Sequence, residues 1–426
     1  MKKRIVILGG GESGWGSAVL AQREGFDVFL SDSGRVAEPY RGRLAEAGIA
    51  FEEGGHTLDR ILSADEAIKS PGIPDKAPVV RALRERGVAV ISEIEFAGRY
   101  LRGGRTVCIT GSNGKTTTTT LIYNIMREAG RQTALGGNIG QSFAYAVATG
   151  DYDWYVLEIS SFQLDGMFDF RADVAVLTNI TPDHLDRYDY DFQNYIDSKF
   201  RIVRNQRAED FFIYSGDDPV IAENLPRHEL PMQLVPFSAG QELCIPFPHM
   251  KIRGLHNKRN ALAASMAAAA AGVDREAIAR ALENFQGVEH RLEPVAEVGG
   301  VEWINDSKAT NVDSVWYALQ SMTRPVVWIA GGTDKGNDYG PLLDLAREKV
   351  HTLVCMGTDN EKLVGAFTGV VPEVIDTHSL DEAVEACRRA ARPGDTALLS
   401  PACASFDLFR NYEDRGEQFK KKVMSL

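Results

Sequence analysis

Residues 110–117, TGSNGKTT, constrain the fold of this chain more than any other segment. They follow a short apolar run at 106–109, which predicts a strand, and they precede a helical pattern at 121–126. A strand, a glycine loop and a helix form a cradle for a triphosphate, because loop N–H groups and the helix N-terminus face phosphate oxygens. Lys115 would reach the β- and γ-phosphates, and the Thr116 hydroxyl would face Mg²⁺.

The spacing of this loop departs from the G-x-x-x-x-G-K-[ST] pattern of the common P-loop. Only Ser112 and Asn113 separate Gly111 from Gly114. Phosphate binding is the favoured interpretation, and an ordinary turn is the alternative for a single loop of this kind.

Composition limits the classes of protein that need considering. The chain has 426 residues, of which 44% are hydrophobic and 25% charged, and this length predicts about three domains. The net charge of −12 argues against non-specific nucleic-acid binding. The five cysteines form no CxxC pair, so we expect a reducing cytoplasm without a disulfide framework or zinc site. We see no apolar run that predicts a signal-peptide core or membrane insertion.

The N-terminal section, predicted as a domain over 1–98, opens with an apolar strand at 5–8 and the glycine-rich turn GGGESG at 9–14. A helix through 18–23 and a strand at 26–30 ending near Asp32 complete a Rossmann-like pattern. A dinucleotide or a nucleotide-sugar pyrophosphate would lie at the helix N-terminus, and the residues leave NAD against another nucleotide open. Glycines that only make a tight turn are the alternative.

The central section, predicted over 99–287, alternates strand and helix patterns. One strand pattern ends at Glu158 and another, at 173–179, leads to His184. Carboxylates and histidines at strand C-termini lie on the ligand side of an open α/β sheet. Glu158 could instead be a paired surface carboxylate. Residues 244–250 predict a small β excursion, and an alanine-rich helix follows through Ala271.

The last section, predicted over 288–426, repeats a pattern of strand followed by turn. Strands are predicted near 326–330, 352–356 and 396–399. This pattern is typical of a second Rossmann-like domain with its own binding edge.

Several motifs in a fixed order make a family resemblance specific. They are SPGIP (70–74), TGSNGKTT (110–117), GNIG (137–140), LEISSFQL (157–164), TNITPDHLDR (178–187), DSKFR (197–201), HNKRNALAA (256–264), HRLE (290–293), NDSKATN (305–311) and SPACASFD (400–407). Together they resemble the Mur ligases, in the branch that adds D-glutamate, over the whole chain. The DNPR motif of the diaminopimelate- or lysine-adding branch is absent. Folylpolyglutamate synthases share the ATP loop but not the first domain.

The resemblance implies an α/β fold of three domains: an N-terminal Rossmann-like nucleotide-sugar domain, a central P-loop-type ATPase domain, and a C-terminal Rossmann-like domain that binds D-glutamate and closes over ATP. It implies an ATP-dependent ligase in peptidoglycan precursor synthesis, which joins D-glutamate to UDP-N-acetylmuramoyl-L-alanine through an acyl phosphate. ATP, two Mg²⁺ ions and CO₂, which would carbamylate Lys199, are the implied cofactors. We expect a cytoplasmic monomer.

The resemblance also implies roles for individual residues. The catalytic set is Lys115, Glu158, His184, Lys199 and Lys308. The ATP set is Gly111, Ser112, Asn113, Gly114, Lys115, Thr116, Thr117, Asn260, Arg291 and Asp306. The metal set is Thr116, Glu158, His184 and the Lys199 carbamate. The UDP-substrate set is Gly14, Ser33, Ser70, Asn138 and His184. The D-glutamate set is Thr310, Lys335, Ser405 and Tyr412.

Some positions depart from the family pattern or carry no signal of their own. A common form has Asp-Thr-Arg after the second strand, whereas this chain has Asp32-Ser33-Gly34-Arg35, which leaves the uracil or phosphate contact open. Tyr412 stands where Phe is usual and preserves the ring. Lys199 alone would be expected to be a solvated side chain.

Two other functions compete with a ligase. A dinucleotide-dependent oxidoreductase would use the glycine-rich turn but leaves the ATP loop, Glu158 and the last domain unexplained. A nucleotide-sensing module without chemistry is disfavoured because the catalytic set is present in full.

Overall fold

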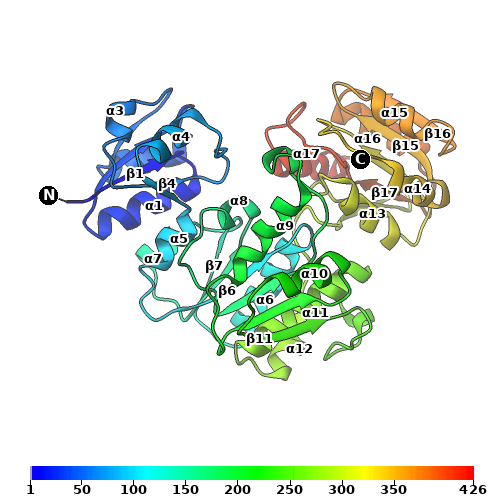
Figure 1. Ribbon diagram of the computed structural model, residues 1–426. Coiled ribbons are helices and arrows are strands. Elements are labelled where there is room, and N and C mark those ends of the chain that lie inside the picture. The colour runs from blue at the N-terminus through cyan, green and yellow to red at the C-terminus, as the bar shows by residue number, and fades with distance from the viewer. Residues whose placement is uncertain (1, 253) are drawn as a thin grey trace. The chain divides into compact units, whose positions relative to one another are not determined.

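The computed structural model describes residues 2–252 and 254–426, which form a mixed α/β protein built on three sheets (Figure 1). This confirms the predicted fold class. The chain divides into two compact units, one made of Met1–His249 and Arg259–Asn284 and the other of Met250–Lys258 and Phe285–Leu426. The first unit contains two of the sheets, so the predicted boundaries after residues 98 and 287 stay predictions. Within the described residues, no helix is both long enough and apolar enough to cross a membrane.

The first sheet has the strand order β3-β2-β1-β4-β5, and all its pairings are parallel. Strands covered on both faces become continuously apolar, as the buried residues 5–8 are. The elements are β1 (Arg4–Leu8), α1 (Glu12–Arg23), β2 (Asp27–Ser31), α2 (Glu38–Glu46), β3 (Ala50–Glu52), α3 (Leu58–Ile61), β4 (Glu66–Lys69), α4 (Pro78–Glu85), β5 (Ala89–Ile91) and α5 (Glu93–Gly98).

The turn between β1 and α1 requires glycine because the backbone passes very close to itself. A Cβ on Gly14 would lie 1.9 Å from the Gly9 carbonyl oxygen. Asp32, which follows β2, accepts a hydrogen bond from the Gly10 N–H at 2.7 Å and another from the Gly34 N–H at 2.8 Å. The acidic residue of the Rossmann-like pattern therefore braces the turn itself.

The second sheet has the order β11-β10-β9-β6-β8-β7, also fully parallel. Its elements are β6 (Arg105–Thr110), α6 (Lys115–Glu128), β7 (Thr133–Gly137), α7 (Phe143–Thr149), β8 (Trp154–Glu158), α8 (Ser161–Leu164), β9 (Val174–Leu177), α9 (Phe192–Phe200), β10 (Phe211–Ser215), α10 (Pro219–Asn224), β11 (Gln233–Phe237), α11 (Leu255–Ala270) and α12 (Arg275–Asn284).

The β excursion predicted at 244–250 is wrong. This segment forms no strand and contains a short 3-10 helix at Phe247–His249. Pro246 and Pro248 lack the N–H groups that a strand ladder needs, which accounts for the difference. The alanine-rich helix is confirmed as α11.

The third sheet belongs to the second unit and has the order β12-β13-β17-β14-β15-β16. The edge strand β12 pairs antiparallel with β13, and the other pairings are parallel. The elements are β12 (Glu293–Val298), β13 (Val301–Asn305), α13 (Val312–Ser321), β14 (Val326–Ala330), α14 (Leu343–Lys349), β15 (Val350–Met356), α15 (Glu361–Phe367), β16 (Glu373–Thr377), α16 (Leu380–Ala390), β17 (Thr396–Leu399) and α17 (Tyr412–Met424).

Candidate functional site

The loop between β6 and α6 requires both of its glycines. Gly111 has φ 144° and Gly114 has φ 82°, in the region that L side chains rarely adopt. A Cβ on Gly111 would lie 1.9 Å from Thr178 Oγ1, and one on Gly114 would lie 2.3 Å from Asn260 Oδ1. The loop is therefore packed between the exit of β9 and helix α11, and no larger residue fits at either position.

Residues that follow β9 hold the loop in place. The Ser112 N–H donates to the Asn179 carbonyl and the Asn113 N–H donates to Asn179 Oδ1, both at 2.9 Å. The Asn113 carbonyl accepts from Thr178 Oγ1 at 2.6 Å and from Asn179 Nδ2 at 2.9 Å. This network fixes the loop before any ligand binds, as an anion cradle requires.

Lys115 opens α6 and folds back over the loop. Its Nζ donates to the carbonyls of Gly111 and Ser112, each at 2.8 Å. Thr116 is half-buried and Thr117 is buried on the first turn of the same helix. A cation, a helix N-terminus and hydroxyl groups thus converge at one end of a parallel sheet, where an anionic ligand is favoured.

Glu158, the last residue of β8, has a side-chain oxygen that lacks a hydrogen bond. The residue is 1% exposed, and its Oε1 accepts a hydrogen bond from Asn138 Nδ2 at 2.8 Å. Its Oε2 is buried and has no partner among the described residues. A buried acceptor left in this state costs about 1–3 kcal/mol, and more when charged. A divalent cation would satisfy it, and oxygen donors suit Mg²⁺, so the site fits this ion.

Lys199 lies on α9 and is buried rather than solvated. It is 1% exposed, and its Nζ donates to the Gly111 carbonyl at 2.8 Å and to Thr110 Oγ1 at 3.3 Å. Burial, followed by the nearby charge of Lys115, holds the pKa of Lys199 well below its usual value of 10.5. A lowered pKa increases the fraction of neutral amine, which is the nucleophilic form.

His184 has a strained backbone and an accessible side chain. Its φ is 53°, and its side chain is 43% exposed. The ring lies 5.1 Å from that of Phe162, centroid to centroid, and its Nε2 lies 3.6 Å from Asp183 Oδ2. Positive φ in a residue other than glycine is concentrated at functional sites.

The residues predicted to bind the UDP substrate lie in the first unit. Ser70 follows β4, and its Oγ lies 3.3 Å from Ser13 Oγ, beside Gly14 on α1. Ser33 is exposed, and Asn138 contacts Glu158.

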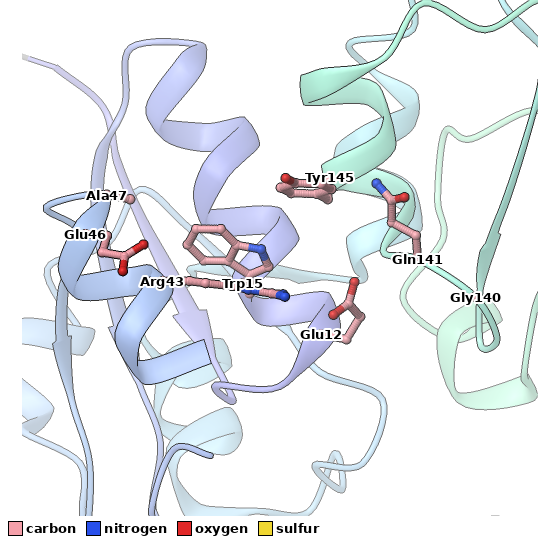
Figure 2. A pocket seen from close by; sticks show the side chains of 8 residues that line it. All are labelled: Glu12, Trp15, Arg43, Glu46, Ala47, Gly140, Gln141 and Tyr145. Atoms are coloured by element: carbon pink, nitrogen blue, oxygen red, sulfur yellow. The ribbon is translucent and has the colours of Figure 1, made fainter. Parts of the chain in front are cut away.

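A pocket of about 750 Å³ lies between α1, α2 and the start of α7. Figure 2 shows its lining residues, Glu12, Trp15, Arg43, Glu46, Ala47, Gly140, Gln141 and Tyr145. None of the residues predicted to bind the UDP substrate is among them, although the loop that carries Asn138 reaches its edge.

Asp306 follows β13 in the second unit and is fully buried. It accepts hydrogen bonds from Ser400 Oγ at 2.8 Å and from the Leu292 N–H at 3.2 Å, and Arg291 lies 3.8 Å away. Burial raises the pKa of Asp306 to about 6, against the lowering effect of Arg291. The two residues predicted to contact ATP in this unit are therefore neighbours.

Arg415 was not predicted from the sequence and organises this part of the second unit. The buried guanidinium donates to Ser307 Oγ at 3.0 Å, to the Ser307 carbonyl at 2.9 Å and to the Cys403 carbonyl at 3.3 Å. It joins the segment that carries Lys308 to the segment that carries Ser405. A single arginine on a helix gives no sequence signal for such a role.

The predicted D-glutamate residues also belong to the second unit. The Lys308 ammonium lies 5.1 Å over the ring of Tyr412. Ser405 is buried, Thr310 is half-buried, and Lys335 is exposed in the loop after β14. The predicted ATP set is divided between the units, because Asn260 belongs to the first and Arg291 to the second.

Three family models match the chain in succession. The MurD N-terminal domain matches residues 4–79, the Mur ligase middle domain matches 109–244, and the glutamate ligase domain of Mur ligases matches 290–403. UDP-N-acetylmuramoylalanine–D-glutamate ligase of Bacteroides fragilis is 54% identical over 100% of both chains. The enzyme of that name from Porphyromonas gingivalis is 50% identical over 100% of this chain and 99% of its own.

Solved structures show the same fold at low identity. UDP-N-acetylmuramate-alanine ligase from Thermotoga maritima matches with a TM-score of 0.61 and 19% identity over 100% of both chains. A Mycobacterium tuberculosis folylpolyglutamate synthase complexed with ADP matches with a TM-score of 0.61 and 15% identity, over 76% of this chain and 92% of its own.

Proposed function

Because this chain belongs to the Mur ligase family, we propose that it is the ATP-dependent ligase that joins D-glutamate to UDP-N-acetylmuramoyl-L-alanine. Glutamate ligases that are 43–54% identical to it match over its full length. The observation that carries the proposal is the clustering of Lys115, Glu158 and Lys199 around one glycine loop. This loop would hold the ATP that the reaction consumes.

The reaction proceeds in two displacements. The alanyl carboxylate of the muramoyl substrate attacks the γ-phosphorus of ATP, and the bond to ADP breaks to leave an acyl phosphate. The neutral amine of D-glutamate then attacks the carbonyl carbon, phosphate leaves, and the nitrogen gives up a proton. Phosphorylation is needed because an unmodified carboxylate oxygen is a poor leaving group.

Lys115 and the N-terminus of α6 stabilise the phosphates in this scheme. Phosphoryl transfer depends mainly on positioning and charge neutralisation, and both groups are fixed before the reaction starts. The carbonyls that now accept from Lys115 hold its Nζ against the loop, so the cation needs little reorganisation to reach a phosphate. Ser112 and Asn113 keep the loop in shape through their hydrogen bonds to Asn179, and Thr117 lies on the first turn of α6, whose N–H groups would face the phosphates.

Thr116, Glu158, His184 and a carbamylated Lys199 would hold two Mg²⁺ ions. Such ions neutralise charge on the transferring phosphoryl group. The neutral Lys199 amine adds to CO₂ and releases a proton, which replaces an ammonium with a carboxylate-like group. The unpartnered Oε2 of Glu158 and the burial of Lys199 support this assignment.

The substrate assignments follow the same reasoning. Gly14, Ser33, Ser70, Asn138 and His184 would contact the UDP substrate. Asn260, Arg291 and Asp306 would contact ATP. Lys308 would face the reaction centre, and Thr310, Lys335, Ser405 and Tyr412 would hold D-glutamate, whose carboxylates need a cation and hydroxyl or N–H donors. We propose a monomer in the cytoplasm that contributes to peptidoglycan precursor synthesis and so to cell shape and division.

Phosphate release tests the proposal. The purified protein should release phosphate from ATP only when UDP-N-acetylmuramoyl-L-alanine and D-glutamate are both present, and L-glutamate serves as the matched control. A product of the mass of the amide should accumulate in proportion. Release that is independent of the amino acid, or NAD(P)H binding without release, would favour one of the competing functions.

A further inference from the structure

Two buried glutamates on helix α5 form hydrogen bonds with segments that connect strands of the second sheet. Glu93 and Glu95 are 2% and 1% exposed. Glu93 Oε1 accepts a hydrogen bond from Ser142 Oγ and another from the Ala144 N–H at 3.0 Å. Glu93 therefore holds the first turn of α7. Helices α1 and α5 lie side by side and both contact α7 (Figure 1).

A second carboxylate holds the same residue from α1. Glu12 Oε1 accepts from the Ser142 N–H at 3.0 Å, and Figure 2 shows Glu12 at the start of α1 on the side of Gln141. Packing here is very close, since a Cβ on Gly16 would lie 1.8 Å from Ser142 Oγ. Ser142 is thus fixed by three residues that belong to the elements of the first sheet.

The other end of the same loop is fixed by Glu158. The Asn138 N–H donates to the Glu158 carbonyl, and Asn138 Nδ2 donates to Glu158 Oε1, both at 2.8 Å. A Cβ on Gly137 would lie 2.2 Å from that carbonyl oxygen. The loop 138–141 is therefore clamped between Glu158 on one side and Glu93 with Glu12 on the other.

We propose that Glu93 is a positioning residue for the ligase reaction, which acts by holding loop 138–141 so that Asn138 orients both Glu158 and the muramoyl substrate. The inference rests on the proposed function. Glu93 would contact neither substrate nor metal, and it lies on α5, which follows the last strand of the first sheet. A catalytic geometry tolerates little displacement, so a loose loop should impair substrate binding and turnover without disturbing the ATP loop.

Glu93 holds the loop through one of its two oxygens. Its Oε2 is buried and has no hydrogen-bond partner among the described residues. Burial raises the pKa of Glu93 to about 7, opposed by the Ser142 hydroxyl and the N–H groups of Ala144 and Phe143 and assisted by the charge of Glu12. The role therefore depends on the Oε1 acceptor, which glutamine keeps while it removes the buried charge.

Glu95 provides a matched control on the same helix. Its Oε2 accepts from the N–H groups of Phe168, Asp169 and Phe170 at 2.9, 3.1 and 2.9 Å. Like Glu93 it is buried and joins α5 to the elements of the second sheet, but its hydrogen bonds go to residues 168–170 and none of them goes to Ser142 or Ala144. Glu95→Ala should therefore cost stability to a similar extent.

The experiment compares Glu93→Ala, Glu93→Gln, Ser142→Ala and Glu95→Ala in the full chain, with wild-type turnover measured first. Glu93→Ala should raise the KM for UDP-N-acetylmuramoyl-L-alanine about tenfold, because its loss leaves the Ser142 and Ala144 donors without their acceptor. The KM for ATP should stay within about twofold of wild type, since the hydrogen bonds that are lost lie outside the ATP loop. Glu93→Gln should restore the muramoyl KM, and Ser142→Ala should show a milder form of the defect.

Amide hydrogen exchange supplies a readout that does not require activity. Exchange should accelerate at 138–144 in Glu93→Ala and at 168–170 in Glu95→Ala. If both alanine variants lose stability while the muramoyl KM and the exchange at 138–144 stay unchanged, Glu93 is only a packing residue and the inference fails. A wild-type protein without D-glutamate-dependent turnover would instead overturn the proposed function, whatever the exchange pattern.

Discussion

Lys115 and Lys199 donate hydrogen bonds to the same acceptor, the carbonyl oxygen of Gly111, and each Nζ lies 2.8 Å from it. Two ammonium groups this close disfavour each other's charge, and the buried partner is the one that loses its proton more easily. Lys199 is that partner. The two lysines are therefore suited to different tasks, one as a cation for phosphate and the other as a neutral amine.

Replacement of Lys115 by alanine should remove most turnover while the protein stays folded. Losing one fixed charge-stabilising group costs about 10²–10³ in rate. Phosphate release and thermal unfolding, measured in parallel, check this, and the exposed Lys3 provides a control whose alanine variant should behave as wild type. Full turnover in a folded Lys115→Ala protein would refute the ATP-loop assignment.

Glu158→Gln should separate activity from stability. The amide oxygen can still accept from Asn138, while the buried charge and its unpartnered oxygen disappear, so the melting temperature should stay equal or rise. Turnover should fall about 10²-fold or more if Glu158 is the charged metal ligand that we propose. Phosphate release over a range of Mg²⁺ concentrations, together with melting curves in chelator, is the measurement. A variant that is destabilised and yet active would contradict the assignment.

Lys199→Ala should be nearly inactive, and a small carboxylate should partly restore it. The physical reason is that the missing group would be an anionic ligand for metal, which acetate or formate can imitate. Stripping CO₂ from the wild-type protein should lower its turnover, and bicarbonate should restore it. Intact mass under mild conditions gives the direct readout, and an active, bicarbonate-treated enzyme with an unmodified Lys199 would exclude the carbamate.

Asp306 should make the folded state less stable as pH rises from about 4 to about 6. Its pKa is raised from 3.8 to about 6, so in this interval the folded protein keeps a proton that the unfolded chain releases. Above both pKa values this decrease in the free energy of unfolding is complete. It amounts to roughly 1.4 kcal/mol for each pH unit that separates the folded and unfolded pKa values. Urea unfolding of wild type and Asp306→Asn should be measured across this pH range. The free energy of unfolding of the variant, relative to that of wild type, should increase as pH rises and then become constant. A constant difference would mean that Asp306 does not titrate in this way.

Short-range patterns predicted much of the fold. Strand β8 ends at Glu158 as expected from its run of apolar residues, which the structure buries. The sequence pattern does not predict strand β12, because β12 lies at the edge of its sheet and its residues are half-exposed or exposed. It does not predict β11 either, since β11 contains Pro236 and also lies at an edge. The segment 244–250 forms no strand because Pro246 and Pro248 cannot donate to a ladder.

Long-range pairings could not be predicted in the same way. The contacts of Arg415 with Ser307 and of Glu93 with Ser142 join residues far apart in the chain, and neither arginine nor glutamate on a helix carries a signal of its own. The roles of Ser33 and Lys335 rest on the family resemblance alone and stay predictions, because an exposed side chain has no buried contact that would indicate a role.

Transfer of a heavy-oxygen label from substrate to phosphate tests the central claim most directly. UDP-N-acetylmuramoyl-L-alanine with a labelled alanyl carboxylate is incubated with ATP and D-glutamate, and the released phosphate is analysed by mass. An acyl-phosphate pathway predicts that each released phosphate carries one oxygen from the labelled carboxylate, and that L-glutamate gives no release. Released phosphate that carries no label would contradict the account.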